Sequence, residues 1–221
     1  MKYVLSWSHV VLGCLFPLCA HAGTPQVRLY YAEMFDFVCG QQTKYQIDQK
    51  WVSELDSRLP EFRTLWQGAG PTLLQTSADV VGKSFDQTEF AVNFSVCSFP
   101  SMSDPLLINM RYSLKSFTAA PIGPNVTVSI IYHEILHQYL KGKIPRASKL
   151  LAKYAGEGDT VLSHLHLFAL QKAVYLKLNQ PQTLNDVIKK DQSLPNKAYA
   201  RTWEIVNTLE DYTSFITELR N

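Results

Sequence analysis

The sequence has few cysteines, and it lacks a C-x-x-C pair, an internal repeat and a low-complexity tract. Only four cysteines occur in 221 residues, and their spacing does not fit a cysteine-based zinc site. No charge of one sign dominates, because 21 basic residues face 19 acidic ones, for a net charge of +2. This near balance argues against nucleic acid or an anionic membrane as the main partner.

Beyond its first 22 residues, the sequence has no stretch long and apolar enough for a membrane span. The N-terminus has a positive Lys2, an apolar run over residues 10–20 and the small-x-small triplet Ala20-His21-Ala22. Residues 11–14 loosely resemble a lipoprotein box, but apolar residues continue after it. We therefore predict a signal peptide over residues 1–22, cleaved after Ala22, and a single secreted or periplasmic domain over residues 23–221.

Loss of the signal peptide leaves two cysteines, Cys39 and Cys97. In an oxidising compartment these two are expected to pair, and closing the loop between them would stabilise the fold by about 4 kcal/mol. Two buried free thiols are the alternative.

The N-terminal half mixes strand and helix patterns. Residues 27–38 are rich in β-formers and predict a strand, or a strand followed by a turn. Apolar residues at three-to-four spacing over 46–67 predict one helix kinked at Pro60, or two helices. The stretch Gly68-Ala69-Gly70-Pro71 then predicts a break before a second helix over 72–81.

Strict alternation of apolar residues over 90–114 predicts an antiparallel hairpin with one buried face. A loop over 119–125 leads to an apolar helix that begins at a capping Asn125 and ends before Gly142. From residue 148 onward the chain is predicted to be helical, with a short helix over 148–154 and a long one over 160–178. A small antiparallel sheet followed by a mainly helical half predicts an α+β fold.

The apolar helix carries His133-Glu134-Ile135-Leu136-His137. Two histidines four residues apart lie on one helix face and can bind one metal ion, and the glutamate beside the first can take a proton from a metal-bound water. With its uncharged flanks, the stretch resembles the extended H-E-x-x-H signature of the zincin superfamily of zinc metallopeptidases. The resemblance implies a sheet before this helix, a third ligand on a later helix, and peptide bound along one strand of the 90–114 hairpin.

The third ligand is expected among a small set, because every histidine outside the signal peptide lies between positions 133 and 166. The metzincin pattern continues after the second histidine with a glycine and a third histidine at fixed spacing. Leu140 and Lys143 occupy these two positions here, so that pattern is absent. Glu157 lies 20 residues after His137, which is a suitable separation for a thermolysin-like third ligand. However, glycines flank it on both sides, and a rigid ligand is hard to hold on such a segment. His164 and His166 point about 200° apart on one helix, so regular geometry lets only one of them bind the same ion. His164 is preferred because its helix face is more polar, and His166 and Glu157 stay open.

These residues predict an exported Zn²⁺-dependent peptidase that acts on a peptide or protein substrate. His133, His137 and His164 would hold the metal, and Glu134 would act as general base. The oxyanion donor is left open among Tyr175, Tyr199, Tyr212 and the histidine that is not a ligand. Two alternatives remain: a non-enzymatic domain with a structural zinc or a relic motif, and a zinc hydrolase of a non-peptide amide. Nothing in the sequence indicates the oligomeric state.

Overall fold

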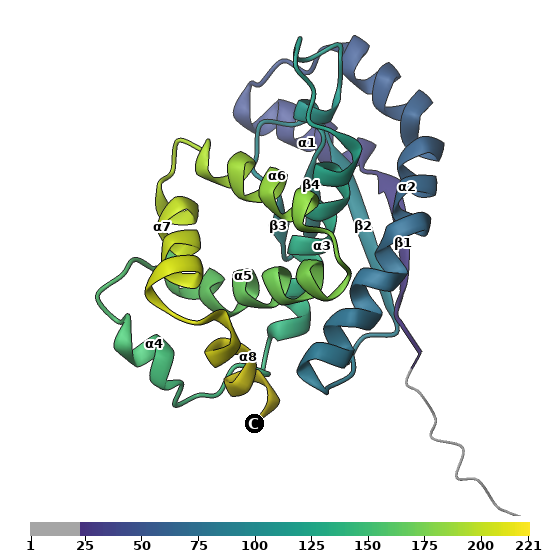
Figure 1. Ribbon diagram of the computed structural model, residues 1–221. Coiled ribbons are helices and arrows are strands. Elements are labelled where there is room, and N and C mark those ends of the chain that lie inside the picture. The colour runs from purple at the N-terminus through teal and green to yellow at the C-terminus, as the bar shows by residue number, and fades with distance from the viewer. Residues whose placement is uncertain (1–22) are drawn as a thin grey trace, which may run out of the picture.

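The computed structural model describes residues 23–221, so the predicted signal peptide and its cleavage site lie outside the described residues. The described chain has a small sheet near its N-terminal side and helices that fill most of the rest, which confirms the predicted α+β class (Figure 1). The elements in chain order are β1 (Gln26–Tyr31), α1 (Glu33–Thr43), α2 (Gln49–Val81), β2 (Glu89–Ser95), β3 (Met102–Ser103), β4 (Leu106–Asn109), η1 (Arg111–Ser113), α3 (Pro124–Leu140), α4 (Lys149–Lys153), α5 (Asp159–Lys177), α6 (Pro181–Gln192), α7 (Ala198–Glu204), η2 (Ile205–Leu209) and α8 (Tyr212–Arg220).

The sheet is mixed, which corrects the expected antiparallel hairpin over 90–114. Its strand order is β1-β2-β4-β3, with β2 parallel to both β1 and β4 and only β3 antiparallel to β4. The alternation was real, since Phe90, Val92 and Phe94 of β2 are buried on one face. However, alternation reports which face is buried and carries no information on strand direction. The chain that follows β2 first forms β3 at the edge of the sheet and then returns as β4, which lies between β2 and β3.

The first predicted strand is shorter than residues 27–38, because the chain turns into helix α1 after Tyr31. The buried carboxylate of Asp36 on α1 accepts hydrogen bonds from the Ser95 hydroxyl and, at 3.0 Å, from the Val96 N–H. One turn further on, Cys39 forms the predicted disulfide with Cys97, with 6.4 Å between their Cα atoms. These links hold α1 against the end of β2.

Helix α2 is one continuous helix over Gln49–Val81, where two or three pieces were expected. It runs through Pro60 and Pro71 because its buried residues keep helical spacing along its whole length and pack on the sheet and on α3 and α5. Gly70 belongs to this packing. A Cβ atom at Gly70 would lie 2.3 Å from the indole of Trp66, so the glycine makes room for the buried ring.

The helical half was predicted more closely. The short helix α4 follows a capping Ser148, and α5 spans Asp159–Lys177 against an expected 160–178. Helix α3 ends at Leu140, before the left-handed Gly142 (φ 78°), but it begins at Pro124 after Gly123, so Asn125 is not its cap. A proline in the first helical position needs no N–H partner, which explains the earlier start.

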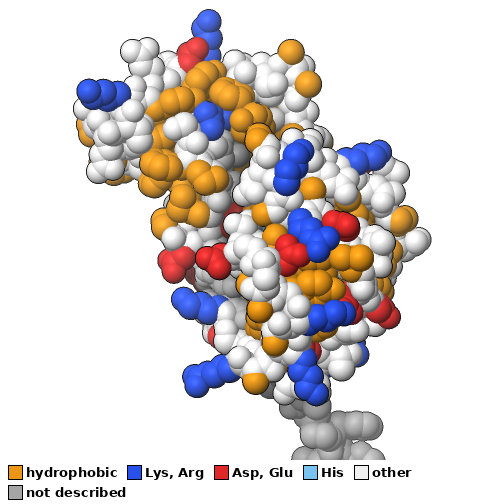
Figure 2. Space-filling view, turned by 90° about the vertical axis from the view of Figure 1, so that its left-hand side faces the viewer, with side chains coloured by type: hydrophobic (Ala, Val, Ile, Leu, Met, Phe, Trp, Pro, Cys, Tyr) orange, Lys and Arg blue, Asp and Glu red, His pale blue; other side chains and the backbone are white. Residues whose placement is uncertain are grey.

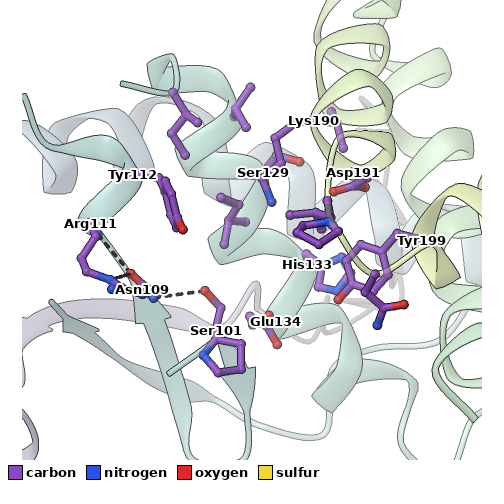
Figure 3. A pocket seen from close by; sticks show the side chains of 18 of the residues that line it. Ser101, Asn109, Arg111, Tyr112, Ser129, His133, Glu134, Lys190, Asp191 and Tyr199 are labelled. Carbon is purple, nitrogen blue, oxygen red and sulfur yellow. Dashed lines mark hydrogen bonds between the residues drawn. The ribbon is translucent and has the colours of Figure 1, made fainter. Parts of the chain in front are cut away.

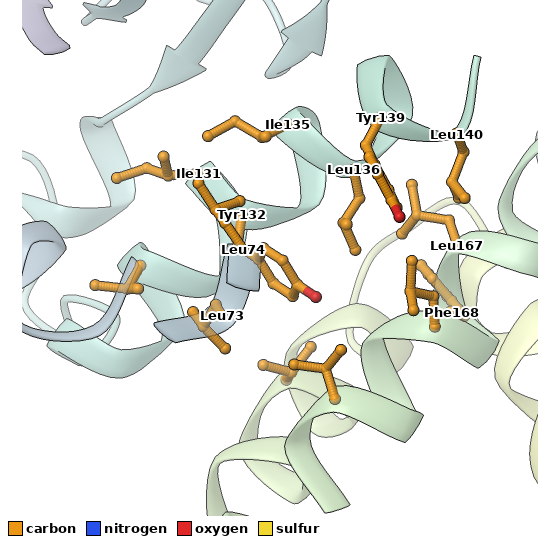
Figure 4. Packing of buried hydrophobic residues seen from close by; sticks show 14 of the residues in the cluster. Leu73, Leu74, Ile131, Tyr132, Ile135, Leu136, Tyr139, Leu140, Leu167 and Phe168 are labelled. Atoms are coloured by element: carbon orange, nitrogen blue, oxygen red, sulfur yellow. The ribbon is translucent and has the colours of Figure 1, made fainter. Parts of the chain in front are cut away.

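Helix α5 lies at the centre of the helical half and contacts α2, α3, α6, α7 and α8. Figure 4 shows Leu136 and Tyr139 of α3 facing Leu167 and Phe168 of α5, and all four are fully buried. No helix within residues 23–221 is both long and apolar enough to cross a membrane. The packing of α3 on α5 sets the distance between the two helices that carry the candidate ligands.

Candidate metal centre

Helix α3 presents the predicted motif toward the helical half. Ile131, Ile135 and Leu136 are buried and anchor the helix, while His133 and His137 lie one turn apart on the face directed at α5. His164 comes from the second turn of α5. The structure therefore brings together the three histidines that the sequence analysis selected, from two helices fixed by their own core packing.

The three imidazoles converge through their Nε2 atoms. The Nε2 atom of His137 lies 3.2 Å from the Nε2 of His133 and 3.2 Å from the Nε2 of His164, and the ligand atoms of all three lie within 4.8 Å of one another. A single Nε2–H can donate to only one of these neighbours. Two nitrogens that bind one tetrahedral zinc ion at about 2.0–2.1 Å lie roughly 3.3 Å apart. The three histidines could therefore hold a metal ion.

His164 is held in the tautomer that a metal ligand needs. Its Nδ1 atom lies 2.6 Å from the carbonyl oxygen of Thr160, one turn earlier on α5. A carbonyl oxygen only accepts, so Nδ1 carries the hydrogen and donates it. The lone pair of His164 is then on Nε2, which is the atom directed at His137. A hydrogen bond of this kind commonly orients a metal-binding histidine.

The electrostatics favour neutral imidazoles. Burial lowers the pKa of His137 and of His164 to about 4, and it moves the pKa of His133 in the same direction. At neutral pH all three side chains are therefore uncharged. Burial also raises the pKa of Glu134 to about 8, with Lys190 acting in the opposite sense. The site thus combines neutral nitrogen donors with a carboxyl group whose proton affinity is high.

The two other candidate ligands are engaged elsewhere. His166 is fully buried on the opposite side of α5, and its Nε2 atom lies 2.9 Å from a carboxylate oxygen of Glu218 on α8. Glu157 accepts two hydrogen bonds from the guanidinium of Arg201, at 2.7 and 2.9 Å. Neither belongs to the histidine group, so the structure brings only His164 to the motif.

One member of the histidine group, His133, lines a cleft of about 520 Å³. His133 and Glu134 line it from α3, and Figure 3 shows them facing side chains from the sheet end, such as Asn109 and Arg111, and from α6 and α7, such as Asp191 and Tyr199. On the face at the left of Figure 1, the surface is hollowed between the upper part of the molecule and the lower helical part, and hydrophobic side chains gather along the upper side (Figure 2). The cleft joins the candidate metal centre to the surface.

Tyr199 stands out among the possible oxyanion donors. It lines the cleft, and its ring centroid lies 4.6 Å from that of His164 and 5.9 Å from that of His133. Burial, together with the charges of Glu134 and Asp191, keeps the pKa of its phenol well above the usual value, so the phenol retains its proton. Tyr175 is buried away from the cleft surface, and Tyr212 packs on Lys172, so neither lines the cleft.

Several cleft residues were missed from the sequence. Ser129 lies four residues before His133 and Gln171 seven after His164, so helical periodicity could have placed both on the ligand faces. Asp191 and Arg111 had no such signal, because they reach the cleft only through the tertiary arrangement of α6 and η1. No protein-family model matches the chain, and neither the curated proteins nor the solved structures include a detectable match. The geometry of the site is therefore the basis for inferring a function.

Proposed function

We propose that this protein is an exported zinc-dependent peptidase of zincin type. One observation carries the proposal: three histidine nitrogens converge, and the first of these histidines, His133, lines a cleft together with the side chain of Glu134. A catalytic zinc site needs three protein ligands and one position open to solvent and substrate. This is the arrangement that the H-E-x-x-H motif predicts.

His133, His137 and His164 would hold the zinc ion, and the ion would supply Lewis-acid chemistry that lowers the pKa of a water molecule toward about 7. A bound cation would lower the pKa of Glu134 from the value of about 8 that burial gives it, so that its carboxylate, which lines the cleft next to His133, could accept the proton as general base. It then passes the proton to the leaving amine. When the deprotonated water bonds to the carbonyl carbon, negative charge develops on the carbonyl oxygen, and the protonated Tyr199 hydroxyl in the same cleft would donate a hydrogen bond to that oxygen.

The sheet offers an edge for an extended peptide next to this site. Strand β3 (Met102–Ser103) is the edge strand, and Pro100 and Ser101, just before it, line the cleft. The side chain of Gln138 on α3 donates a hydrogen bond of 2.5 Å to the Ser103 carbonyl and fixes this edge against the helix. A substrate that pairs with the free side of β3 would pass across the cleft.

Two alternatives use the same histidines. A structural metal site is closed by a fourth protein ligand. Within residues 23–221 the group comprises three histidines and no fourth residue, which favours an open site. A zinc hydrolase of a non-peptide amide needs the same open site, so substrate tests distinguish it from a peptidase. The disulfide supports a location outside the cytoplasm.

The test is replacement of Glu134 by Gln in the purified, zinc-loaded protein. Metal content measured by mass spectrometry should stay at the wild-type level, and hydrolysis of a mixed peptide library should fall by about 100-fold or more because the general base is lost. Glu89→Gln, an exposed change on β2, is the matched control and should keep full activity. A Glu134→Gln protein with unchanged hydrolysis would overturn the mechanism. A wild-type protein that cleaves amides but no peptide would support the non-peptide hydrolase instead.

A further inference from the structure

A polar pocket lies beside the candidate metal centre, one helical turn away along α3. Ser129 precedes His133 by four residues, and Gln171 follows His164 by seven, so both share the faces that carry the histidines. The Gln171 side-chain amide donates a hydrogen bond of 2.9 Å to the Ser129 hydroxyl, which joins the two helices at the cleft wall. Both residues line the cleft.

Gln171 contributes a hydrogen-bond acceptor that has no donor. The residue is 1% exposed, and its Oε1 atom is buried without a hydrogen-bond partner anywhere in residues 23–221. A buried amide oxygen without a donor costs free energy, so native structures nearly always give it a partner. The amide nitrogen already donates to Ser129, and the buried Tyr175 hydroxyl lies beside both residues without a hydrogen-bond partner of its own, so the orphaned Gln171 oxygen can only accept.

Asp191 adds a negative charge at the same end of the cleft. It lies in the last turn of α6 and is 8% exposed, and the Trp203 indole N–H donates to its Oδ2 atom at 2.9 Å. In the part of the chain that the structure describes, no Lys, Arg or His nitrogen lies within 4.0 Å of this carboxylate. Figure 3 shows Asp191 and Ser129 on the His133 side of the cleft, far from Arg111. Lys190 also lines the cleft and its charge acts on Asp191, but it makes no ion pair with the carboxylate, and a buried carboxylate without a paired cation is unfavourable.

We propose that Ser129, Gln171 and Asp191, here called the acceptor pocket, bind a cationic nitrogen group of the substrate next to the scissile bond. An ammonium or guanidinium group supplies both the ion-pair partner that Asp191 lacks and the N–H donor that Gln171 lacks. The acceptor pocket makes this group a specificity determinant, which rests on the proposed peptidase function. Two sources share the chemistry: a lysine or arginine side chain, and the free α-amine of a peptide.

The experiment measures binding without turnover, in zinc-loaded Glu134→Gln protein. The probes are five-residue peptides that are identical except at one central position, which is lysine, arginine, norleucine or glutamate, all blocked at both ends. A further norleucine peptide keeps its free α-amine. Calorimetric titration should give a dissociation constant at least tenfold lower for the cationic probes than for blocked norleucine. Preference for the lysine and arginine peptides identifies a side-chain pocket, and preference for the free amine identifies a pocket for the peptide N-terminus.

Two substitutions locate the preference. Asp191→Asn keeps an oxygen for the Trp203 indole but removes the charge, and it should abolish the tenfold preference while leaving norleucine binding unchanged. Gln171→Met, which removes the orphaned acceptor, should reduce the preference by itself and serves as a second variant if Asp191→Asn unfolds. Asp186→Asn is the matched control on α6, because Asp186 accepts from Gln182 at 2.9 Å and does not line the cleft.

The outcomes for the acceptor pocket and for the peptidase are separable. Equal dissociation constants for all probes, no binding of any probe, or a preference that survives both substitutions would overturn the acceptor pocket. If the probes bind with the expected preference but the wild-type protein cleaves none of them, the acceptor pocket stands and the peptidase proposal falls. If the wild-type protein cleaves norleucine and lysine peptides equally well, the peptidase stands and the pocket does not.

Discussion

His164 and His166 lie two residues apart on α5, yet the structure gives them different surroundings. His164 faces the motif histidines, whereas His166 forms a hydrogen bond with Glu218 in the core between α5 and α8. Their helical spacing correctly placed them on opposite faces. The polarity of each face was only a weak guide to which histidine would bind the metal. The reason is that His166 is covered by α8, whose Glu218 lies about 50 positions later in the sequence. The preference for His164 matches the geometry, and its role as a ligand stays a prediction.

Metal content tests that role. His164→Ala should lose at least 90% of the bound zinc, because two histidines leave the site incomplete. His166→Ala should keep it, although losing the buried bond to Glu218 should lower the free energy of unfolding by about 1–3 kcal/mol. Mass spectrometry on both proteins after dialysis gives the comparison. Full zinc occupancy in His164→Ala would show that this residue is not a ligand.

Glu54 on α2 makes stability depend on pH at a site remote from the cleft. Burial alone would raise its pKa, but hydrogen bonds from the backbone N–H groups of Ser116 and Lys115 and from Arg58 outweigh burial and lower the pKa to about 2. A carboxyl group with a lowered folded-state pKa stabilises the fold above its unfolded pKa of about 4.3. That contribution is lost as the pH falls toward 2.

Glu54→Gln should therefore reduce the free energy of unfolding at pH 7 by about 1–2 kcal/mol, a figure that allows for solvent screening of a side chain near the surface. The difference between the two proteins should shrink as the pH falls from 5 to 2, since wild-type Glu54 becomes protonated over that range. Urea unfolding at several pH values measures both quantities. A difference that stays constant from pH 7 to 2 would contradict this account.

At the scale of the elements, α2 shows how packing overrides local signals. The segment Gly68-Ala69-Gly70-Pro71 has the composition of a break, and the sequence analysis placed one there. The buried face of α2 continues through it, from Trp66 to Leu73 and Leu74, and this burial outweighs the low helix propensity of glycine and the hydrogen bond lost at Pro71. Long-range packing of this kind has no signature within the segment itself.

The two glycines of this segment should respond to alanine in opposite ways. Gly70→Ala places a methyl group against the Trp66 indole and should lower the free energy of unfolding by about 1–3 kcal/mol. Gly68→Ala meets no atom within 4 Å and should raise stability by up to about 1 kcal/mol through helix propensity. Chemical denaturation of the pair checks both signs. Stabilisation by Gly70→Ala would mean that Trp66 can repack freely.

For the whole molecule, the candidate metal centre joins the two halves of the fold. Two of its histidines lie on α3, which packs on the sheet, and the third lies on α5, the central helix of the C-terminal half. The sequence indicated the two halves and the motif, because both depend on local periodicity. It could not indicate the parallel pairing of β2 with its neighbours or the cleft. Both arise from chain crossings and helix arrangements that span many residues.

Zinc bound at this junction should stabilise the complete fold. With free zinc at 100 times its dissociation constant, the free energy of unfolding should rise by about 2.7 kcal/mol, which is roughly 5–10 °C in the midpoint of thermal unfolding. Calorimetry with zinc and with a chelator gives this shift for the wild-type protein. His137→Ala, which lacks the central ligand, should show no shift. An equal shift in His137→Ala would place the stabilising zinc elsewhere.

The C-terminal helix α8 has a further consequence, for the order in which the chain can fold. It packs on α5, and the Arg220 side chain donates a hydrogen bond of 2.8 Å to the Val80 carbonyl, 140 positions away. Leu219 and Phe215 are fully buried there. The core around α5 is therefore incomplete until Tyr212–Arg220 has reached its place. Native contacts between residues this distant in sequence slow folding, so we expect the geometry of the candidate metal centre, which depends on the packing of α5, to form only after α8 has docked.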